Sequence, residues 1–197
     1  MSSIKRVLVL GLMVATVLCT TGLKVKAADG SYGAGSLLAL QGVKGAAVYY
    51  IGSDGKKYVF PDEKTYMTWY ANFDDVVRVS VTELDKYANG GAITYRPGTK
   101  LVTTTDTTHI YAVEPGGVLR WIPTETVAKA LYGDKWYTKV QNVIPGYFSS
   151  SYTSGSDLTA DKYPTGTLLQ VGSDQYYVDG TSVRKFASAD AFEANNF

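Results

Sequence analysis

Few residues of this chain could carry out catalysis. The chain has one histidine, His109, and one cysteine, Cys19. His109 follows the polar stretch 103–108, and no Gly-x-Ser-x-Gly motif occurs that would place a nucleophilic serine at a sharp turn. We therefore interpret His109 as an exposed loop residue, and we expect no acyl-transfer chemistry.

The acidic residues favour structural roles. Asp62 and Glu63 are adjacent, as are Asp74 and Asp75, but neighbouring carboxylates are common where helices begin and the helix dipole favours negative charge. Calcium binding is an alternative, because aspartates also fall in expected loops, although no Asp-x-Asp-x-Asp-Gly motif is present. These loop residues are Asp54, Asp106 and Asp179. We expect no enzyme activity, no cofactor and no metal, unless a continuation beyond Phe197 carries a catalytic domain.

Tyrosine is the unusual feature of the composition, with 16 copies. Many of these rings fall on short segments that are expected to form strands, with arginine nearby. Flat aromatic faces beside arginine suit sugar rings or another protein surface. The alternative is that the rings only pack against one another across neighbouring strands. The predicted ligand-binding residues are Tyr49, Tyr50, Tyr58, Tyr111, Arg120, Trp121, Tyr176, Tyr177 and Arg184.

Three stretches of the chain share one order of features. They open at Gly35, Gly98 and Gly166, with spacings of 63 and 68 residues. In each stretch, a run rich in strand-forming residues leads through a glycine turn into a second such run, which is the pattern of a hairpin. The paired strands are expected at 48–51 and 57–60, at 110–113 and 119–122, and at 176–178 and 183–186.

A helix is expected after each hairpin. Asp62, Thr124 and Ser188 occupy one aligned position, and all three side chains can accept hydrogen bonds from the free amides of a first helical turn. In the first stretch, four rings have the i, i+3, i+4, i+7 spacing of one helix face, which is more typical of a core than of a binding site. They are Tyr66, Trp69, Tyr70 and Phe73.

Two further segments can be assigned from the pattern. A second helix is predicted from Ser80, because Ser80 and Glu83 have capping-box spacing, and the pair Gly90 and Gly91 would end it. The serine-rich segment 149–156 is predicted to be a loop or a flexible linker.

These features predict an α+β fold made of tandem repeats, each a short antiparallel β-hairpin or three-strand meander followed by a capped helix. The expected organisation is a signal peptide at 1–27, an N-terminal linker at 28–34, a first repeat at 35–97, a second at 98–165 and an incomplete third at 166–197. Because arrays need polar terminal units, we expect a longer protein of which this is the first part; the alternative is a shortened final unit.

The amino terminus predicts export. Lys5 and Arg6 precede the uncharged apolar stretch 7–23, and small residues near Ala27 suit a signal peptidase, which would leave Ala28 as the first mature residue. One alternative is an uncleaved membrane anchor, since the apolar stretch is near the minimum for spanning a bilayer. Another is lipidation at Cys19, but Leu18 is a poor residue before a lipidated cysteine.

Cleavage would also change the charge. It would remove four basic residues and leave 15 basic against 18 acidic, a net charge of −3. Such a balance gives no electrostatic reason to expect nucleic acid or an anionic membrane as a partner. We expect membrane contact only through the signal segment, if it is uncleaved. The mature chain would contain no thiol, so its stability must come from packing.

The segments 48–61 and 110–123 resemble a repeat of exported bacterial cell-surface proteins that are largely uncharacterised, in which a Tyr-x-Val-x-x-Gly hairpin precedes an Arg-x-Ile-Pro-Ser/Thr helix start. The resemblance covers 35–197 and implies a surface or envelope location, with no catalytic residues to transfer. A second likeness, to choline-binding and glucan-binding cell-wall repeats, rests on Tyr49-Tyr50 and Asp54-Gly55. Those repeats are shorter and have no helix.

We therefore expect a secreted or cell-surface, non-enzymatic repeat module for attachment, assembly or protein interaction. The alternative is a cell-wall polysaccharide-binding module, which could be the targeting part of a longer hydrolase. The expected partner is accordingly an envelope polysaccharide or another surface protein.

Overall fold

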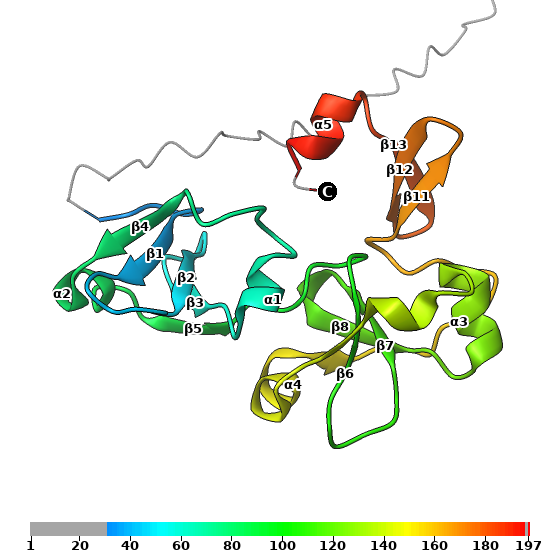
Figure 1. Ribbon diagram of the computed structural model, residues 1–197, viewed down its shortest axis with the longest axis horizontal. Helices are drawn as coiled ribbons and strands as arrows, with labels where there is room; N and C mark the ends of the chain where they lie inside the picture. The colour runs from blue at the N-terminus through cyan, green and yellow to red at the C-terminus, as the bar shows by residue number, and fades with distance from the viewer. Residues whose placement is uncertain (1–30, 196) are drawn as a thin grey trace, which may run out of the picture.

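The computed structural model describes residues 31–195 and 197. The predicted signal peptide at 1–27, and residues 28–30 of the linker predicted at 28–34, lie outside the described residues. Short strands and a few short helices make up the described chain, so the fold is α+β, as expected. Three sheets occupy separate parts of the molecule (Figure 1).

The first sheet has five strands in the order β4-β1-β2-β3-β5. An antiparallel meander forms its centre, and the two outer strands run parallel to their neighbours, β4 beside β1 and β5 beside β3. The elements are β1 (Leu37–Leu40), β2 (Val48–Ile51), β3 (Lys57–Val59), α1 (Glu63–Tyr66), β4 (Val76–Val79), α2 (Val81–Leu84) and β5 (Asn89–Ala92).

The second sheet also has five strands, in the order β10-β8-β7-β6-β9. Its centre is again an antiparallel meander, with β9 parallel to β6 and β10 parallel to β8. The elements are β6 (Leu101–Thr103), β7 (Tyr111–Glu114), η1 (Pro115–Gly117), β8 (Val118–Trp121), α3 (Glu125–Tyr132), η2 (Trp136–Lys139), β9 (Val140–Asn142), α4 (Pro145–Ser151) and β10 (Thr153–Ser154).

The third sheet has three strands, which form an antiparallel meander followed by a helix. These elements are β11 (Leu168–Val171), β12 (Asp174–Asp179), β13 (Ser182–Lys185) and α5 (Ala189–Glu193). All three predicted hairpins are therefore present, as β2–β3, β7–β8 and β12–β13.

The three predicted caps are confirmed. The Asp62 carboxylate accepts from the Thr65 amide at 2.7 Å, and the Thr124 hydroxyl accepts from the amide three residues on at 3.2 Å. Ser188 does the same for α5 at 3.1 Å. Ser80 caps α2 through the Glu83 amide at 3.2 Å. Side-chain type together with position after each hairpin, and the capping-box spacing at Ser80, located these helix starts.

The length of the first helix was predicted wrongly. α1 ends at Tyr66, so it does not carry all four rings on one regular helix. The chain tightens there because the Thr68 hydroxyl bonds back to the Thr65 carbonyl oxygen at 2.7 Å, and the Trp69 amide bonds to the Tyr66 carbonyl oxygen. The rings still gather: Tyr66 stacks on Tyr70 at 5.2 Å and on Phe73 at 4.4 Å between centroids.

Two other assignments were wrong. Gly90 and Gly91 do not end a helix but lie within β5, where Gly90 lets the strand approach the ring of Tyr58. The segment 149–156 is not a linker, because it contains the end of α4 and all of β10. The hydroxyls of Ser149 and Ser150 donate to the Gly146 carbonyl oxygen within α4. A serine-rich sequence that is typical of linkers therefore forms hydrogen bonds within a helix here.

Each five-stranded sheet is covered on both faces. In the first, Leu37, Ala39 and Phe60 pack with α1, whereas Leu38 and Ile51 pack with α2. In the second, one face packs with α3 around Leu101, Ala128 and Leu131, and the other packs around Val102, Val113 and Val143. Alternating side chains of the central strands thus enter two cores, which explains why strands such as β1 and β2 have no charged residue.

Candidate functional site

The predicted binding residues of the first sheet lie partly in its cores. Tyr49 and Tyr50 are half-buried on opposite faces, one beside the Leu38 cluster and the other beside the Leu37 cluster. Lys57 Nζ lies 6.0 Å from the centroid of the Tyr49 ring. These two tyrosines therefore contribute mainly to packing, which was the alternative interpretation of the aromatic strands.

Tyr58 keeps its ring at the surface and is held there. Its hydroxyl donates to Asp54 Oδ2 at 2.8 Å, and this hydrogen bond raises the pKa of Tyr58 above its ordinary value and lowers that of Asp54. The ring covers two glycines, since a Cβ on Gly52 would lie 2.7 Å from it and one on Gly90 would lie 2.4 Å from it.

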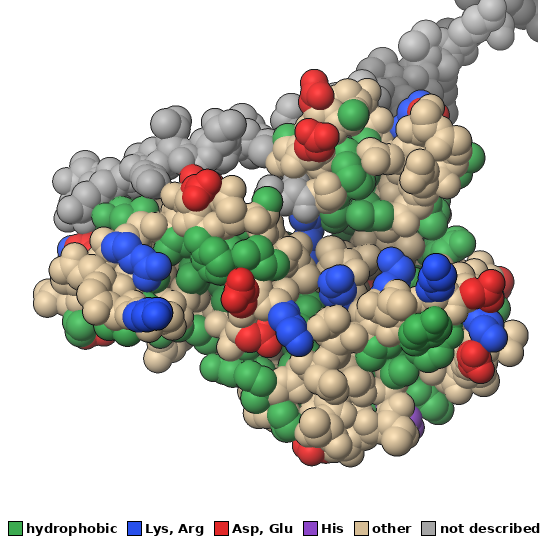
Figure 2. Space-filling view, viewed as in Figure 1, with side chains coloured by type: hydrophobic (Ala, Val, Ile, Leu, Met, Phe, Trp, Pro, Cys, Tyr) green, Lys and Arg blue, Asp and Glu red, His purple; other side chains and the backbone are tan. Residues whose placement is uncertain are grey.

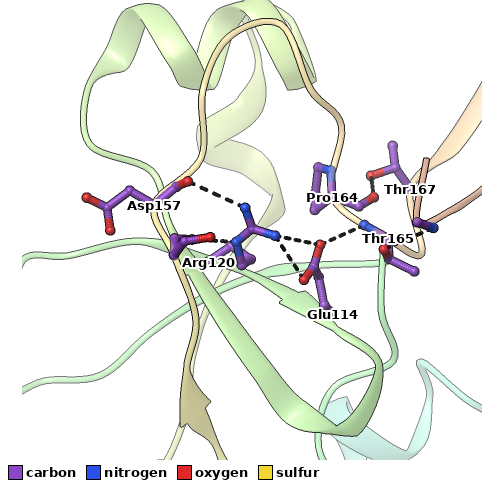
Figure 3. Close-up of polar contacts among 8 residues, drawn as sticks. Glu114, Arg120, Asp157, Pro164, Thr165 and Thr167 are labelled. Carbon is purple, nitrogen blue, oxygen red and sulfur yellow. Dashed lines mark hydrogen bonds and ion pairs between the residues drawn. The ribbon is translucent and has the colours of Figure 1, made fainter.

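Arg120 is a structural residue (Figure 3). Its guanidinium binds both oxygens of Glu114, at 3.0 and 3.1 Å, and donates to the main-chain carbonyl oxygens of Ser156 and Asp157. The Arg120 and Glu114 side chains are only 16% and 15% exposed. Glu114 Oε1 also accepts from the Thr165 amide at 2.9 Å. The donors of Arg120 are therefore used within the molecule.

The residues predicted on the third sheet are more accessible. Tyr176 and Tyr177 are half-buried on β12, and Tyr177 lies 6.3 Å from the ring of Phe197. Burial is the main cause that raises the pKa of Tyr177. Arg184 is exposed and donates to Asp179 Oδ2 at 2.7 Å. None of these side chains lines either of the two best-defined hollows in the described part of the chain.

Two predicted residues, Tyr111 and Trp121, belong to one aromatic group with His109. Tyr111 and Trp121 are paired across β7 and β8, and the Trp121 ring lies 4.6 Å from the His109 ring at an angle of 31°. His109 Nδ1 lies 3.3 Å from the Tyr111 hydroxyl. His109 and Trp121 of this group line a hollow with a volume of about 260 Å³.

The hollow lies at the connection between the end of β8 and the start of α3. Trp121 ends β8, Thr124 caps α3, and the first turn of α3 supplies Glu125. Trp136, at the start of η2, lines the hollow as well. The Trp136 indole Nε1 is buried and has no hydrogen-bond partner among the described residues.

Comparison with protein-family models, with curated proteins and with solved structures returned no match.

His109, Glu125 and Trp136 were not predicted as site residues. His109 is an exposed loop residue, as predicted, but it lies two residues before Tyr111, which pairs with Trp121, so its place beside these rings could have been suspected. Trp136 gave no comparable signal, because it reaches the hollow from beyond α3. Glu125 lies in the first turn of α3, and its carboxylate forms an ion pair with Lys129 at 2.9 Å.

The chemistry that these groups offer is recognition by aromatic faces and neutral hydroxyls. Within the described ranges there is no group of three or more His, Cys, Asp or Glu side chains that could hold a metal ion. Charged side chains of both signs are spread over the face seen in Figure 2. No helix of the described chain has the length and apolar character needed to cross a membrane.

Proposed function

We propose that the chain is an exported, non-enzymatic tandem-repeat module that acts in attachment or assembly at the cell surface. The matching strand orders of the two five-stranded sheets support the repeat assignment. The register supports it too, because Tyr50, Ala112 and Tyr177 occupy the same place in the three meanders, opposite Tyr58, Arg120 and Arg184.

The turns that begin the three units give independent support. Each contains Tyr-x-x-Gly followed by serine or threonine, starting at Tyr32, Tyr95 and Tyr163. The glycines at the fourth position all have positive φ, between 76° and 98°. Thr99 and Thr167 each bond through the hydroxyl to the main-chain oxygen three residues earlier, both at 2.7 Å. The same local structure therefore begins successive units.

The observation that carries the proposal is that adjacent units are tied together. Tyr95, which follows the first sheet, is 1% exposed and lies in a core of the second. Glu114 of the second unit accepts from Thr165 at the entry to the third. The Arg96 guanidinium lies 3.5 Å from the ring centroid of Phe197. Units fixed in this way can present several contact surfaces at once, which strengthens attachment through multivalency.

Polysaccharide binding is the second candidate, and the aromatic hollow beside Trp121 is the observation that favours it. Flat indole faces suit sugar rings. A protein-interaction module would not need such a hollow, because protein contacts are made mainly through larger, flatter surfaces.

Retention on envelope material tests both candidates. The chain from Ala28 to Phe197 would be mixed with whole envelopes, with protease-treated envelopes and with deproteinised wall polysaccharide. Retention that protease treatment abolishes supports a surface protein as partner, and retention on the polysaccharide supports the second candidate. An unrelated exported domain of similar size and charge is the control, and retention no greater than that of the control in all three samples would contradict both.

A further inference from the structure

An aromatic pair fills the space between meander and helix in the first and third units. Phe60 contacts Tyr66 edge-on, with ring centroids 5.0 Å apart and an angle of 74°. Phe186 contacts Phe192 in the same manner, at 5.2 Å and 83°. In both pairs, the first ring lies two residues before the helix cap and the second lies four residues after it.

The second unit lacks both of these rings. Counting from its cap, Thr124, the same two positions hold Ile122 and Ala128, which are 7% and 1% exposed. Both residues line the hollow of about 260 Å³. The hollow therefore lies where the other units place a pair of aromatic side chains.

Rings instead surround this space in the second unit. Trp121 stands at the position that Val59 and Lys185 occupy in the other meanders. His109 stands two residues before Tyr111, where the first unit has Ala47 before Tyr49. Together with Trp136, these residues give the hollow aromatic walls. Small interior residues combined with large surrounding rings are the arrangement of a ligand site rather than of a core.

The polar groups define the class of ligand. Glu125 is 64% exposed and paired with Lys129 at 2.9 Å, so its carboxylate is partly neutralised and can still accept a hydrogen bond from a neutral hydroxyl. Thr108 and Thr124 supply neutral groups at the lining. The Trp136 indole Nε1 is itself buried, so Thr108, Thr124 and Glu125 are the polar side chains that a ligand in the hollow would contact. Alternating hydroxyls on a ring with an apolar face meet all of these requirements.

We propose that this hollow binds one pyranose ring of a neutral glycan, stacked on Trp121. The proposal deepens the polysaccharide candidate above and rests on it. The volume is below the roughly 300–1,000 Å³ of sites for drug-sized ligands, so a single ring fits and the rest of the glycan would extend into solvent.

Nuclear magnetic resonance of the indole N–H groups tests the proposal. The chain has three tryptophans, and Trp69 lies outside the hollow, where its Nε1 donates to the Thr94 carbonyl oxygen at 2.8 Å. Titration with chitotetraose, cellotetraose and maltotetraose should shift the signals of Trp121 and Trp136 saturably for at least one sugar and leave Trp69 unmoved. No saturable shift with any of the three, or saturation only with choline, would overturn the proposal.

Ala128→Phe is the matched variant, because it installs the ring that the third unit carries at this position in Phe192. We expect at least about a tenfold loss of affinity, as for Trp121→Ala, with circular dichroism preserved and the melting temperature somewhat lowered, because Ala128 is 1% exposed and packed in a core. Unchanged sugar affinity in a folded A128F variant would contradict the site. Should A128F fail to fold, Trp121→Val, which copies Val59 of the first unit, provides the same comparison.

Envelope retention separates this inference from the proposed function. If A128F loses the sugar but is still retained on whole envelopes, attachment uses another surface and the glycan site stands by itself. If the wild-type chain is retained on envelopes but binds none of the three sugars, the glycan site is wrong and the attachment function survives.

Discussion

At the scale of single residues, equivalent positions have different roles in different units. Arg120 and Arg184 occupy the same register position, but Arg120 is only 16% exposed, against Glu114 and two main-chain carbonyls, whereas Arg184 is 66% exposed. Burial decides their energetic importance, because an exposed ion pair contributes little and a buried charge that loses its partner is costly.

Replacing Arg120 with Ala should therefore destabilise the protein strongly. The change leaves Glu114, which is only 15% exposed, without its charged partner and removes donors from the Ser156 and Asp157 carbonyls. We expect a loss of about 1.5–3 kcal/mol in the free energy of unfolding, measured by urea denaturation. Arg184→Ala is the control and should cost less than about 1 kcal/mol. Equal losses for the two variants would contradict this account.

The buried tyrosines predict loss of stability in alkali. Burial raises the pKa of Tyr66, Tyr70 and Tyr95 from 10.0 to about 12. Between pH 10 and 12 the unfolded chain loses these protons and the folded chain keeps them, so the free energy of unfolding falls as pH rises. Below pH 10 these tyrosines are protonated in both states, so their full contribution to the free energy of unfolding is present. Thermal melts between pH 9 and 12, with ultraviolet titration of tyrosine, should show a steep decline above pH 10, which Tyr70→Phe would reduce.

Residue types predicted the helix caps but not the contacts of Arg120. Asp62, Thr124 and Ser188 act on amides three residues away, so their role could be read from the local sequence. Arg120 is bound by carbonyls more than 30 residues later in the chain, at Ser156 and Asp157. Only the folded arrangement of β8 beside β10 brings these groups together, so the sequence could indicate aromatic and basic strands but not which side chains stay free.

At the scale of elements, most helices are too short to be stable alone. α1 and α2 each span four residues, and α3, with eight, is the longest helix described. Isolated helices of this length are marginal in water, so packing and caps must hold them. The periodic spacing of the rings predicted the wrong end for α1. The helix stops at Tyr66, but the rings that follow it, such as Phe73, still pack together.

The cap of α3 should make a measurable contribution to stability. Thr124→Ala removes the acceptor for the Val127 amide and should lower the free energy of unfolding by about 1 kcal/mol. Thr124→Ser retains the hydroxyl and should stay within about 0.5 kcal/mol of the wild type. Since Thr124 also lines the hollow, chemical denaturation without sugar is the appropriate measurement.

At the scale of the whole molecule, two glycines meet where the second and third units join. Gly98 has φ +76°, and a Cβ there would lie 1.8 Å from the Gly166 carbonyl oxygen. Both the conformation and the close approach require glycine. The recurrence of glycine was visible in the sequence, but the contact between two of the three copies was not, because repetition does not reveal how successive units pack.

Gly98→Ala should therefore disturb the junction between these units. We expect a destabilisation of more than the roughly 1–3 kcal/mol that positive φ alone imposes on alanine. Gly180→Ala is the control, because it has φ +62° with no atom within 4 Å of its Cβ and so pays only the conformational cost. Melting temperature and the rate of trypsin cleavage in the segment 157–166 are the measurements. A G98A variant no worse than G180A would show that the contact is unimportant.

Tyr95 bears on how the chain can be divided for study. Its ring belongs to a core of the second sheet, and its amide is held by the Tyr152 hydroxyl at 2.9 Å, whereas two residues earlier the Ile93 amide donates to Val59 of the first sheet. A fragment of the second unit that begins at Gly98 would open a cavity the size of a tyrosine side chain. Expression of that unit by itself should therefore begin no later than Thr94, and the first unit should keep Ile93 as its last ordered residue.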